Sequence, residues 1–506
     1  MVDGHARLTV PIDTPAWVRE AVFYQIFPDR FATSERVHKP GPMEPWDSPP
    51  TAHGFKGGDL LGIAERLPYL ADLGITALYL TPIFRSASNH RYHTYDYLEV
   101  DPLLGGDAAL RELLDRAHDR GMRVILDGVF NHTGRGFWPF HHVLENGLDS
   151  PYRHWFHVDE AALAAGRPLH AYPPPGTPRS ALGYQAWWGL PALPKLNTDD
   201  PDVREYLFRV AEHWLRFGID GWRLDVPAEI ADEAFWQEFR TRCRAIRPDS
   251  YLVGEIWEIA PAWLRGDRFD ALMNYPLAEA ILSFAGGPSL DMGVVNGHHE
   301  YGRTVGPLDG PRFAQRLVQT LEAYDPDVVA VQLNLLGSHD APRMRTVLGG
   351  DDAAVRLAVL LQLSLPGAPC IYYGDEVGLA GGNDPACRGA FPWDEARWDA
   401  GLRGFVRDMA RLRSREPALR HGTTTILAAA DGAVVYERRL GERCLVVAIN
   451  AGLTSATVRI PSPGSGAVHP ERLVGTRASA AATPSAEGLA LLLPARSGEI
   501  LGLGPG

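Results

Sequence analysis

The sequence of 506 residues contains little cysteine and no long hydrophobic run. Its cysteines are widely separated and form no C-x-x-C pair: Cys243, Cys370, Cys387 and Cys444. This spacing argues against a disulfide framework or a thiolate zinc site and favours reduced thiols in a cytoplasmic protein. The longest apolar stretches, residues 357–365 and 489–494, are far shorter than the roughly 18 residues of a membrane span. The polar segment 1–10 has no apolar core of a secretory signal.

Positive charge is scarce relative to negative charge. The chain has 49 Lys and Arg against 62 Asp and Glu, so its formal net charge is −13, and no basic run compensates locally. We therefore expect no nucleic-acid partner. Hydrophobic residues make up 45% and charged residues 22%, which is typical of a globular protein and excludes wholesale disorder.

One structural unit recurs along the chain: an amphipathic helix, a glycine and a short apolar strand. In the clearest copy, Asp200 is the expected N-cap of a helix over 200–217, Gly218 ends it, and a strand follows at 221–226. Two further copies lie at residues 60–80 and 108–130. Helices that alternate with short apolar strands predict a parallel sheet.

Eight apolar segments are candidate strands: 21–27, 75–81, 122–130, 221–226, 251–255, 271–274, 331–336 and 370–373. Eight parallel strands suit a closed (β/α)8 TIM barrel of the α/β class. An open doubly wound sheet would alternate in the same way, but no G-x-G-x-x-G turn follows the first strand. The sequence therefore predicts a barrel.

Two regions depart from this alternation. Residues 132–198, which follow the third strand, are rich in Pro, His, Trp and Phe and predict an inserted lobe over the mouth of the barrel. Beyond residue 421 the helical pattern stops, and short apolar runs predict a C-terminal antiparallel β-sandwich over 422–506. The barrel itself is expected over 1–131 and 199–421.

Polar residues gather where the predicted strands end, which is where barrel enzymes place their functional groups. They are Asp127, Asn131 and His132 after the third strand, Arg223 and Asp225 after the fourth, Glu255 after the fifth, and His339 and Asp340 after the seventh. Side chains alternate along a strand, so Arg223 and Asp225 share one face. If that face is the barrel axis, we expect Arg223 to keep the buried Asp225 carboxylate ionised.

Three carboxylates at one barrel mouth, Asp225, Glu255 and Asp340, suit glycoside hydrolysis with retention of configuration. Two other readings remain open. A single acidic residue at a strand end is more often a helix cap or a surface ion pair. A metal site is a further alternative, with Asp127, His132, His339 and Asp340 as ligands, although no H-E-x-x-H spacing supports it. The adjacent Trp187 and Trp188 fit either the core of the lobe or a platform for sugar rings.

Four strings identify a family resemblance: DGVFNH at 127–132, GWRLDV at 221–226, VGEIW at 253–257 and NLLGSHD at 334–340. In order and spacing they resemble the four signature regions of the α-amylase family of glycoside hydrolases. The resemblance extends from residue 22 to residue 388. The string LPKLN at 193–197 is similar to the branch that contains neopullulanases, cyclomaltodextrinases and maltogenic amylases.

The resemblance implies a role for each matching residue. Asp225 would be the nucleophile, Glu255 the general acid and base, and Asp340 the transition-state stabiliser. The implied substrate-binding and supporting residues are Arg223, which would orient Asp225; His132 and His339, which would bond hydroxyls of the sugar at the cleaved bond; Tyr92, which would stack on its ring; Asp384 and Arg388, toward the non-reducing end; Glu229 and Trp257, on the acceptor side; and Asp127 and Asn131, which would support this wall.

The sequence also departs from this branch. The first predicted strand begins near residue 21, so the N-terminal β domain that members of the branch carry is not expected, and we predict a monomer with a more open cleft. Residues 32–43 lack the Asn and Asp series that binds calcium in relatives, so no structural calcium or other cofactor is expected there. Residues 226–229 and 92–97 differ from the usual strings close to the substrate.

We therefore predict a cytoplasmic, retaining α-glucan hydrolase that cleaves α-1,4 bonds of maltooligosaccharides and related glucans such as starch, cyclodextrin and pullulan. The alternatives within the same chemistry are a 4-α-glucanotransferase and an α-glucosidase. An alternative of another class is a non-catalytic carbohydrate-binding protein.

Overall fold

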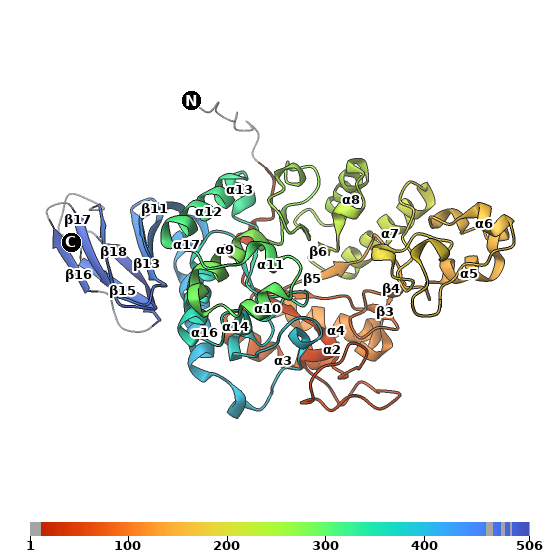
Figure 1. Cartoon of the computed structure of the whole chain (residues 1–506), viewed down its shortest axis with the longest axis horizontal. Coiled ribbons are helices and arrows are strands. Elements are labelled where there is room, and N and C mark those ends of the chain that lie inside the picture. The colour runs from red at the N-terminus through yellow and green to blue at the C-terminus, as the bar shows by residue number, and fades with distance from the viewer. Residues whose placement is uncertain (1–11, 462–468, 477–480, 486–487, 505–506) are drawn as a thin grey trace.

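The computed structural model describes residues 12–461, 469–476, 481–485 and 488–504. The segment 1–10, for which no secretory signal is expected, lies outside these residues. A central α/β unit lies between the region of α5 and α6 at one end of the molecule and the C-terminal strands at the other (Figure 1).

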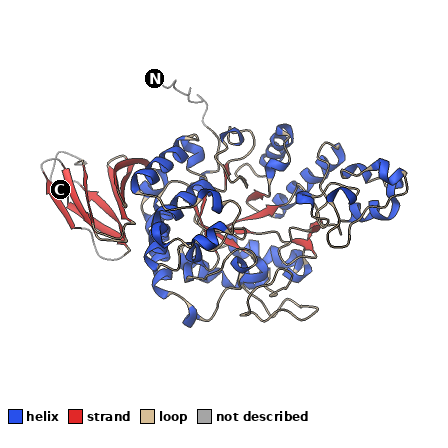
Figure 2. Ribbon diagram, in the orientation of Figure 1, coloured by secondary structure: helices blue, strands red, loops and turns tan. Residues whose placement is uncertain are grey.

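The central unit is a barrel of eight parallel strands with helices around it (Figure 2). In spatial order the strands are β8 (Ala271–Leu272), β7 (Tyr251–Gly254), β6 (Gly221–Leu224), β5 (Arg123–Gly128), β2 (Ala77–Leu80), β1 (Phe23–Ile26), β10 (Ala368–Tyr372) and β9 (Leu333–Leu335). A parallel bridge from Met273 to Leu333 joins the two ends of this order and closes the barrel. The prediction of a (β/α)8 barrel is confirmed. Seven of the predicted segments contain one of these strands, and the eighth, 370–373, overlaps β10, which begins two residues earlier.

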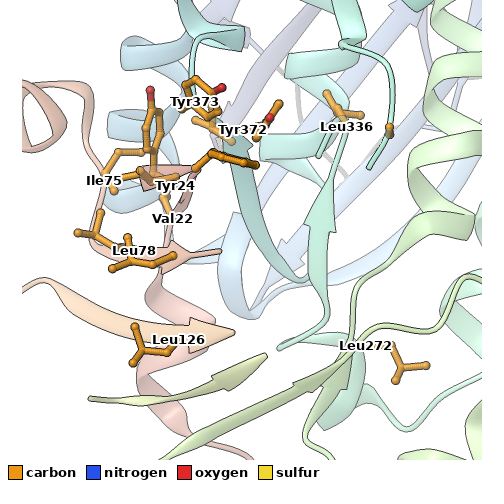
Figure 3. Packing of buried hydrophobic residues seen from close by; sticks show 14 of the residues in the cluster. Val22, Tyr24, Ile75, Leu78, Leu126, Leu272, Leu336, Tyr372 and Tyr373 are labelled. Carbon is orange, nitrogen blue, oxygen red and sulfur yellow. The ribbon is translucent and has the colours of Figure 1, made fainter. Parts of the chain in front are cut away.

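The barrel strands separate two apolar clusters because successive side chains point to opposite faces. Phe23, Tyr79 and Val253 belong to the cluster inside the barrel. The outer cluster packs the strands against the surrounding helices, and Figure 3 shows members of it around the barrel: Val22 just before β1, Leu78 in β2, Leu126 in β5 and Leu272 in β8. Trp222 and Leu224 of β6 belong to this outer cluster. The alternation therefore directs Arg223 and Asp225 toward the barrel axis, as predicted.

The helices around the barrel are α1 (Ala16–Glu20), α2 (Pro28–Phe31), α3 (Leu60–Leu73), α4 (Gly106–His118), α7 (Pro201–Phe217), α8 (Glu233–Ile246), α9 (Tyr275–Gly286), α10 (Met292–Asn296), α11 (Tyr301–Thr304), α12 (Gly310–Glu322), α13 (Pro326–Val329), α14 (Met344–Val347), α15 (Asp352–Ser364), α16 (Ala400–Arg415) and α17 (Pro417–His421). The predicted caps of α7 are present. The Asp200 carboxylate accepts hydrogen bonds from the N–H groups of Asp202 and Val203, and Gly218 ends the helix with a φ of 118°.

Residues 132–198 contain little regular structure beyond α5 (Trp138–Asn146), α6 (Glu160–Ala164) and short 3-10 turns. Isolated antiparallel bridges hold three extended segments of this region together and join them to the barrel: His132 with Lys195, Phe156 with Leu196, Val158 with Tyr184, and Ala186 with Pro194. A two-stranded sheet of β3 (Phe84–Ser86) and β4 (Thr94–Val100) precedes α4.

The C-terminal region consists of two antiparallel sheets. The first has the order β11 (Thr423–Ala430), β12 (Ala433–Leu440), β13 (Arg443–Asn450), β18 (Ser497–Gly504) and β15 (His469–Gly475), and the second has the order β14 (Ala456–Ile460), β17 (Gly488–Leu493) and β16 (Ala481–Ser485). Val435 and Val446 from the first sheet share one buried cluster with Val458 and Leu491 from the second. This shared core makes the region a β-sandwich, as predicted. Across the described ranges, no helix combines the length and the apolar character that crossing a membrane requires.

Candidate active site

The predicted acidic residues meet at one end of the barrel because they come from the carboxyl ends of parallel strands. Asp127 lies in β5, Asp225 follows β6, Glu255 follows β7, and Asp340 lies five residues after β9. Asp127, Asp225 and Glu255 are all buried, whereas the Asp340 side chain retains about a third of its exposure.

Arg223 of β6 connects three of these carboxylates. Its Nη1 lies 2.8 Å from Oδ1 of Asp127 and 3.0 Å from Oδ1 of Asp225, and its Nη2 lies 2.8 Å from Oε2 of Glu255. Arg223 is fully buried, and its Nε lies 3.4 Å from Sδ of Met273. One guanidinium therefore fixes the relative positions of three carboxylates that come from three successive strands.

The two oxygens of Asp225 have different surroundings. Oδ1 accepts a hydrogen bond from Arg223, whereas Oδ2 is buried and has no hydrogen-bond partner among the described residues. Burial raises the pKa of Asp225 well above its ordinary value; Arg223 opposes this rise, and Glu255, Asp127 and Asp340 add to it. Arg223 lowers the pKa of Asp225, which is the effect expected of it, but burial and the neighbouring carboxylates outweigh this effect, because one guanidinium serves several carboxylates in a desolvated space.

The Glu255 carboxylate is held by two donors besides its contact with Arg223. The backbone N–H of Val226 lies 3.1 Å from Oε2, and the indole Nε1 of Trp257 lies 3.2 Å from Oε1. Val226 has a φ of 35°, which is a left-handed conformation that a β-branched residue rarely adopts. This strained backbone directs the N–H group at Glu255.

Asp340 is held on the opposite side of the site by Arg388. The Arg388 Nη2 lies 3.1 Å from Oδ1 of Asp340, its Nε donates to the backbone carbonyl of His339, and its Nη1 lies 3.2 Å from Oδ1 of Asp384. Arg388 thus links Asp340 to Asp384, two of the residues that the family resemblance assigns to the substrate. Burial also raises the pKa of Asp384, and Arg388 opposes that rise.

Tyr92, Asp127 and His339 form a hydrogen-bonded wall. Oδ2 of Asp127 accepts hydrogen bonds of 2.7 Å from the hydroxyl groups of Tyr92 and Tyr79. The Tyr92 hydroxyl also contacts Nε2 of His339, and the two rings are parallel with centroids 5.3 Å apart. Asp127 therefore supports both Arg223 and Tyr92, which agrees with the supporting position expected for it.

His339 is neutral in this wall. Its pKa is lowered well below the ordinary value by burial and by Arg388 and Arg223. The Gln25 amide nitrogen lies 2.9 Å from Nδ1, and a hydrogen bond donated there leaves the ring proton on Nε2, which lies 3.1 Å from Oδ2 of Asp340. Gln25 therefore orients His339 toward Asp340.

His132 lies at the border between the barrel and the inserted region. Its ring is parallel to Trp187 with centroids 4.9 Å apart, and its Nδ1 lies 3.3 Å from the Asn131 amide nitrogen. Burial lowers the pKa of His132 to about 3, so the ring is neutral. Its Nε2 is buried and has no hydrogen-bond partner within the described part of the chain.

Two more predicted residues lie at the edge of the site. The Glu229 side chain is 42% exposed and lies 3.2 Å from Nζ of Lys195, which belongs to the inserted region. Trp257 is stacked on Tyr275 with ring centroids 3.5 Å apart. Glu229 is therefore outside the carboxylate cluster, whereas Trp257 reaches it through Glu255.

The alternative of a metal site receives no geometric support from these residues. Both oxygens of Asp127 accept hydrogen bonds from Arg223, Tyr79 and Tyr92, and His339 is held by Gln25. Over the described ranges, no group of three or more His, Cys, Asp or Glu residues is placed to bind a metal ion.

Sequence reasoning did not find several residues that position the site: Gln25, Tyr79, Lys195, Val226 and Tyr275. Gln25 offered a signal, because it is a polar residue inside an apolar strand, and its amide reaches His339. Tyr79 shares the inner face of β2, so alternation within that strand would have placed it at the barrel axis. Lys195 lies in the LPKLN string, but its contact with Glu229 could not be read locally, because the two residues are 34 positions apart.

Comparisons with known proteins agree with this geometry. The family model described as alpha amylase, catalytic domain, matches residues 25–420. The chain is 44% identical to a cyclomaltodextrinase of Geobacillus thermopakistaniensis (strain MAS1), over 95% of this chain and 76% of that protein. It is 41% identical to neopullulanase 2 of Thermoactinomyces vulgaris, over 90% of this chain and 73% of that protein. It is 37% identical to an intracellular maltogenic amylase of Bacillus subtilis (strain 168), over 87% and 69%.

Solved structures give the same result. The native debranching enzyme of Nostoc punctiforme has a TM-score of 0.87 and 48% identity, over 97% of this chain and 100% of that chain. The ligand-free cyclic alpha-maltosyl-(1→6)-maltose hydrolase of Arthrobacter globiformis has a TM-score of 0.83 and 37% identity, over 97% and 100%. The chain therefore belongs to the α-amylase family and is a glycoside hydrolase.

Proposed function

We propose that the protein is a retaining α-glucan hydrolase that cleaves α-1,4 bonds of maltooligosaccharides and related glucans such as starch, cyclodextrin and pullulan. The observation that carries this proposal is the arrangement of Asp225 and Glu255 around Arg223. One oxygen of Asp225 is held by Arg223 while the other, Oδ2, is left without a protein partner, and Glu255 contacts the same guanidinium. A fixed carboxylate with one uncommitted oxygen suits nucleophilic attack.

In the first step, Glu255 gives its proton to the glycosidic oxygen while Oδ2 of Asp225 forms a bond to the anomeric carbon. The C–O bond to the leaving sugar breaks, and a β-glucosyl ester of Asp225 results. The raised pKa of Asp225 supports a cluster that binds a proton more readily than isolated carboxylates do. We place this proton on Glu255 in the complex that reacts, where Asp225 is ionised. In that complex, before the ester forms, the positive charge of Arg223 stabilises the negative charge of the Asp225 carboxylate.

In the second step, Glu255 accepts a proton from a water molecule, and the water oxygen attacks the anomeric carbon. The bond to Asp225 breaks, so the product keeps the α configuration. Neutral His132 and His339 can both donate and accept hydrogen bonds to sugar hydroxyls. Asp340, which retains part of its exposure between Arg388 and His339, is placed to bind hydroxyls of the same sugar.

Cleavage of α-1,6 bonds is a second candidate activity of the same site. Two of the similar solved structures are named as a debranching enzyme and as a hydrolase of cyclic alpha-maltosyl-(1→6)-maltose. In the proposed mechanism Asp225 and Glu255 act at the anomeric carbon and the glycosidic oxygen, which both linkages contain, so the same pair can serve either linkage. The choice between linkages would be made on the acceptor side, where Glu229 and Trp257 lie.

We further propose that the enzyme works in the cytoplasm as a monomer and without a metal cofactor. The four cysteines are all buried and free, which suits a reducing compartment. One of the relatives is named an intracellular maltogenic amylase. Light scattering coupled to size-exclusion chromatography measures the assembly state directly, and dialysis against a chelator should leave the activity unchanged.

The proposed function is tested by the products formed from maltotriose, β-cyclodextrin, pullulan and starch, with the anomeric form followed by NMR. We expect the α-anomer to appear first. Asp225→Asn and Glu255→Gln should each lower kcat by about three orders of magnitude or more while the protein keeps its fold. Glu258→Gln, at an exposed carboxylate three residues after Glu255, is the matched control and should keep its activity.

Three outcomes would contradict the proposal. Initial release of the β-anomer would show inversion rather than retention. Activity near the original level in Asp225→Asn or Glu255→Gln would remove those residues from the chemistry. Transfer products that dominate at all substrate concentrations would make the protein a glucanotransferase with the same carboxylates.

A further inference from the structure

A groove crosses the inserted region outside the catalytic cluster. Its volume is about 770 Å³, and its lining includes His157, Asp159, Arg179, Gln185 and Trp188. The catalytic steps described above use none of these residues. The lining mixes hydrogen-bond donors, acceptors and one large aromatic plane, which is a combination suited to a carbohydrate.

A stack of three rings connects this groove to the barrel mouth. His132 is parallel to Trp187, and Trp187 is stacked on Trp188 with centroids 4.7 Å apart and an angle of 14°. Trp188 is 68% exposed to solvent. Its φ of 52° places its backbone in the left-handed region, which residues other than glycine rarely adopt. A large aromatic face is thus presented to solvent at the rim of the groove, two rings away from a residue of the candidate active site.

A backbone ladder makes the same connection. His132 is bridged to Lys195, the Lys195 N–H donates to the Gln185 carbonyl at 3.0 Å, and the Gln185 N–H donates to the His157 carbonyl at 2.8 Å. Directly paired residues on neighbouring extended segments project their side chains on the same face. Lys195, at the middle of this ladder, contacts Glu229 at the edge of the site. The ladder therefore links two residues of the groove lining, Gln185 and His157, to the acceptor side.

The polar side chains of the groove are available for a ligand. Arg179, Ser180 and Gln185 are exposed, and within the described ranges none of their side chains makes a hydrogen bond or ion pair in the structure. Arg179 is instead packed close to Gly189, which follows Trp188. Donors and acceptors that face solvent beside an exposed tryptophan match the alternating hydroxyl groups and apolar ring faces of glucose units.

We infer that this groove binds the part of an α-glucan chain that continues past Lys195 and Glu229, beyond the cleaved bond. Trp188 stacks on a glucose ring, and Arg179 and Gln185 bind hydroxyl groups of the chain. The inference rests on the proposed function, since it extends the path of that substrate. It implies that long chains gain binding energy that maltotriose cannot reach.

The test compares Trp188→Ala with Trp138→Ala. Trp138 is 62% exposed on α5 of the same region but lies outside the groove lining, so it is a matched control. We expect Trp188→Ala to lower kcat/KM for long linear maltodextrins by about tenfold, which corresponds to about 1.4 kcal/mol, and to change that for maltotriose by less than about twofold. Arg179→Ala should act in the same direction, whereas Trp138→Ala should change neither value.

Binding is measured separately from turnover by calorimetry with the Glu255→Gln protein. Adding Trp188→Ala to that background should weaken the binding of long maltodextrins and leave the binding of maltotriose unchanged. Equal losses of affinity for long and short substrates, or no loss for long ones, would overturn the proposal that the groove binds the glucan chain. If the unmodified enzyme turned over no glucan while Glu255→Gln still bound long maltodextrins through Trp188, the proposed function would fail and the groove would stand.

Discussion

Arg223 determines the geometry of the site at the scale of single residues. It is fully buried and contacts Asp127, Asp225 and Glu255 with two nitrogen atoms. A buried carboxylate is costly unless it is paired, and one guanidinium pairs three. The cluster therefore holds protons more strongly than isolated acids do, as the raised pKa values of Asp225 and Asp127 show. This is the property that a retaining mechanism requires of one member of the pair.

Tyr79→Phe tests how the hydroxyl groups around Asp127 tune this cluster. The substitution removes one hydrogen bond to the Asp127 carboxylate, whose pKa that bond helps to lower against the effect of burial. The pKa of Asp127 should therefore rise further, and the acidic limb of the pH profile of kcat/KM should move to higher pH. The free energy of unfolding should fall by about 1.5–3 kcal/mol, as for other hydrogen bonds to charged groups.

The control for Tyr79→Phe is Tyr24→Phe. Tyr24 also donates to a buried carboxylate, that of Glu376, but it belongs to the outer cluster of the barrel. Its removal should lower stability by a similar amount without moving the acidic limb. A shift of the same size in both variants would show that the limb reports general loosening of the barrel rather than the protonation of the Asp127 cluster.

The buried carboxyl group of Glu279 in α9 should make the stability of the protein depend on pH. Burial raises its pKa to about 7, Glu300 adds to the rise, and Thr304 and Arg316 oppose it. The unfolded chain loses this proton near pH 4.5, so the folded state binds more protons between that pH and about 7. The contribution of Glu279 to stability is thus complete below pH 4.5 and is lost as the pH rises through 7.

Glu279→Gln should therefore stabilise the protein at pH 8 by up to about 3 kcal/mol and have little effect at pH 4. Urea unfolding midpoints of both proteins at the two pH values measure the difference. Asp375, whose pKa burial also raises to about 7, contributes equally to both proteins and cancels. An equal change at pH 4 and pH 8 would show that the substitution acts through packing instead of through the buried charge.

The residues of the site could be predicted from the sequence where a local rule places them. Alternation along β6 put Arg223 and Asp225 on one face, and the structure places both at the barrel axis. The raised pKa of Asp225 could not be predicted in this way, because it depends on burial and on carboxylates from other strands. Lys195 was missed for a related reason: its contact with Glu229 depends on the fold of the inserted region.

At the scale of elements, helices and strands with a clear period were predicted well. The helix α3 begins at Leu60, where the recurring unit at 60–80 begins, and α7 has both its Asp200 cap and its Gly218 end. Most barrel strands are shorter than the apolar runs that predict them, because backbone pairing ends before the apolar residues do; β10 is the exception and begins two residues before its predicted start. The sequence of residues 132–198 shows no regular hydrophobic repeat that could be used for prediction. The region is held together instead by isolated bridges and by aromatic contacts such as that between Phe140 and Phe156.

Two glycine substitutions test the local rules at this scale. Gly218 ends α7 with a φ of 118°, where the nearest side-chain atoms leave room for a methyl group, so only the backbone conformation opposes Gly218→Ala. Gly404 lies inside α16 with open space around it and ordinary helical geometry. We expect Gly218→Ala to destabilise the protein by about 1 kcal/mol or more and Gly404→Ala to stabilise it by about 0.5–1 kcal/mol.

The urea midpoints of the two variants, measured side by side, check this pair. Both substitutions add the same methyl group, so any difference in sign comes from the backbone. If Gly218→Ala were neutral, the αL end of α7 would not be needed for the entry into β6. If Gly404→Ala were destabilising, the methyl group would meet an obstacle that the structure does not contain.

At the scale of the whole molecule, the β-sandwich is joined to the barrel by buried polar contacts. Arg496, which lies between β17 and β18, donates to the carbonyls of Ala285 in α9 and Ala451 and contacts Ser289 and Asp351. The hydroxyl of Tyr436 in β12 meets that of Ser364 at the end of α15. The two parts therefore share part of their hydrogen bonding, which predicts that they unfold together.

Arg496→Ala should weaken this union. It leaves two backbone carbonyls and the Asp351 carboxylate without the guanidinium, which should cost about 2 kcal/mol or more. In hydrogen-exchange measurements the amides of β12 and β13 should exchange with the same free energy as those of β5 and β6 in the original protein. In Arg496→Ala the amides of the sandwich should exchange first, because the sandwich can open while the barrel stays folded.

Arg459→Ala, at an exposed position of β14 in the same sandwich, is the control and should leave both sets of amides coupled. A sandwich that already exchanges independently in the original protein would show that the contacts of Arg496 and Tyr436 are too weak to couple the two parts. Activity offers a separate reading. The site is built from barrel strands and the inserted region, so uncoupling the sandwich should lower the temperature at which activity is lost without changing kcat at low temperature.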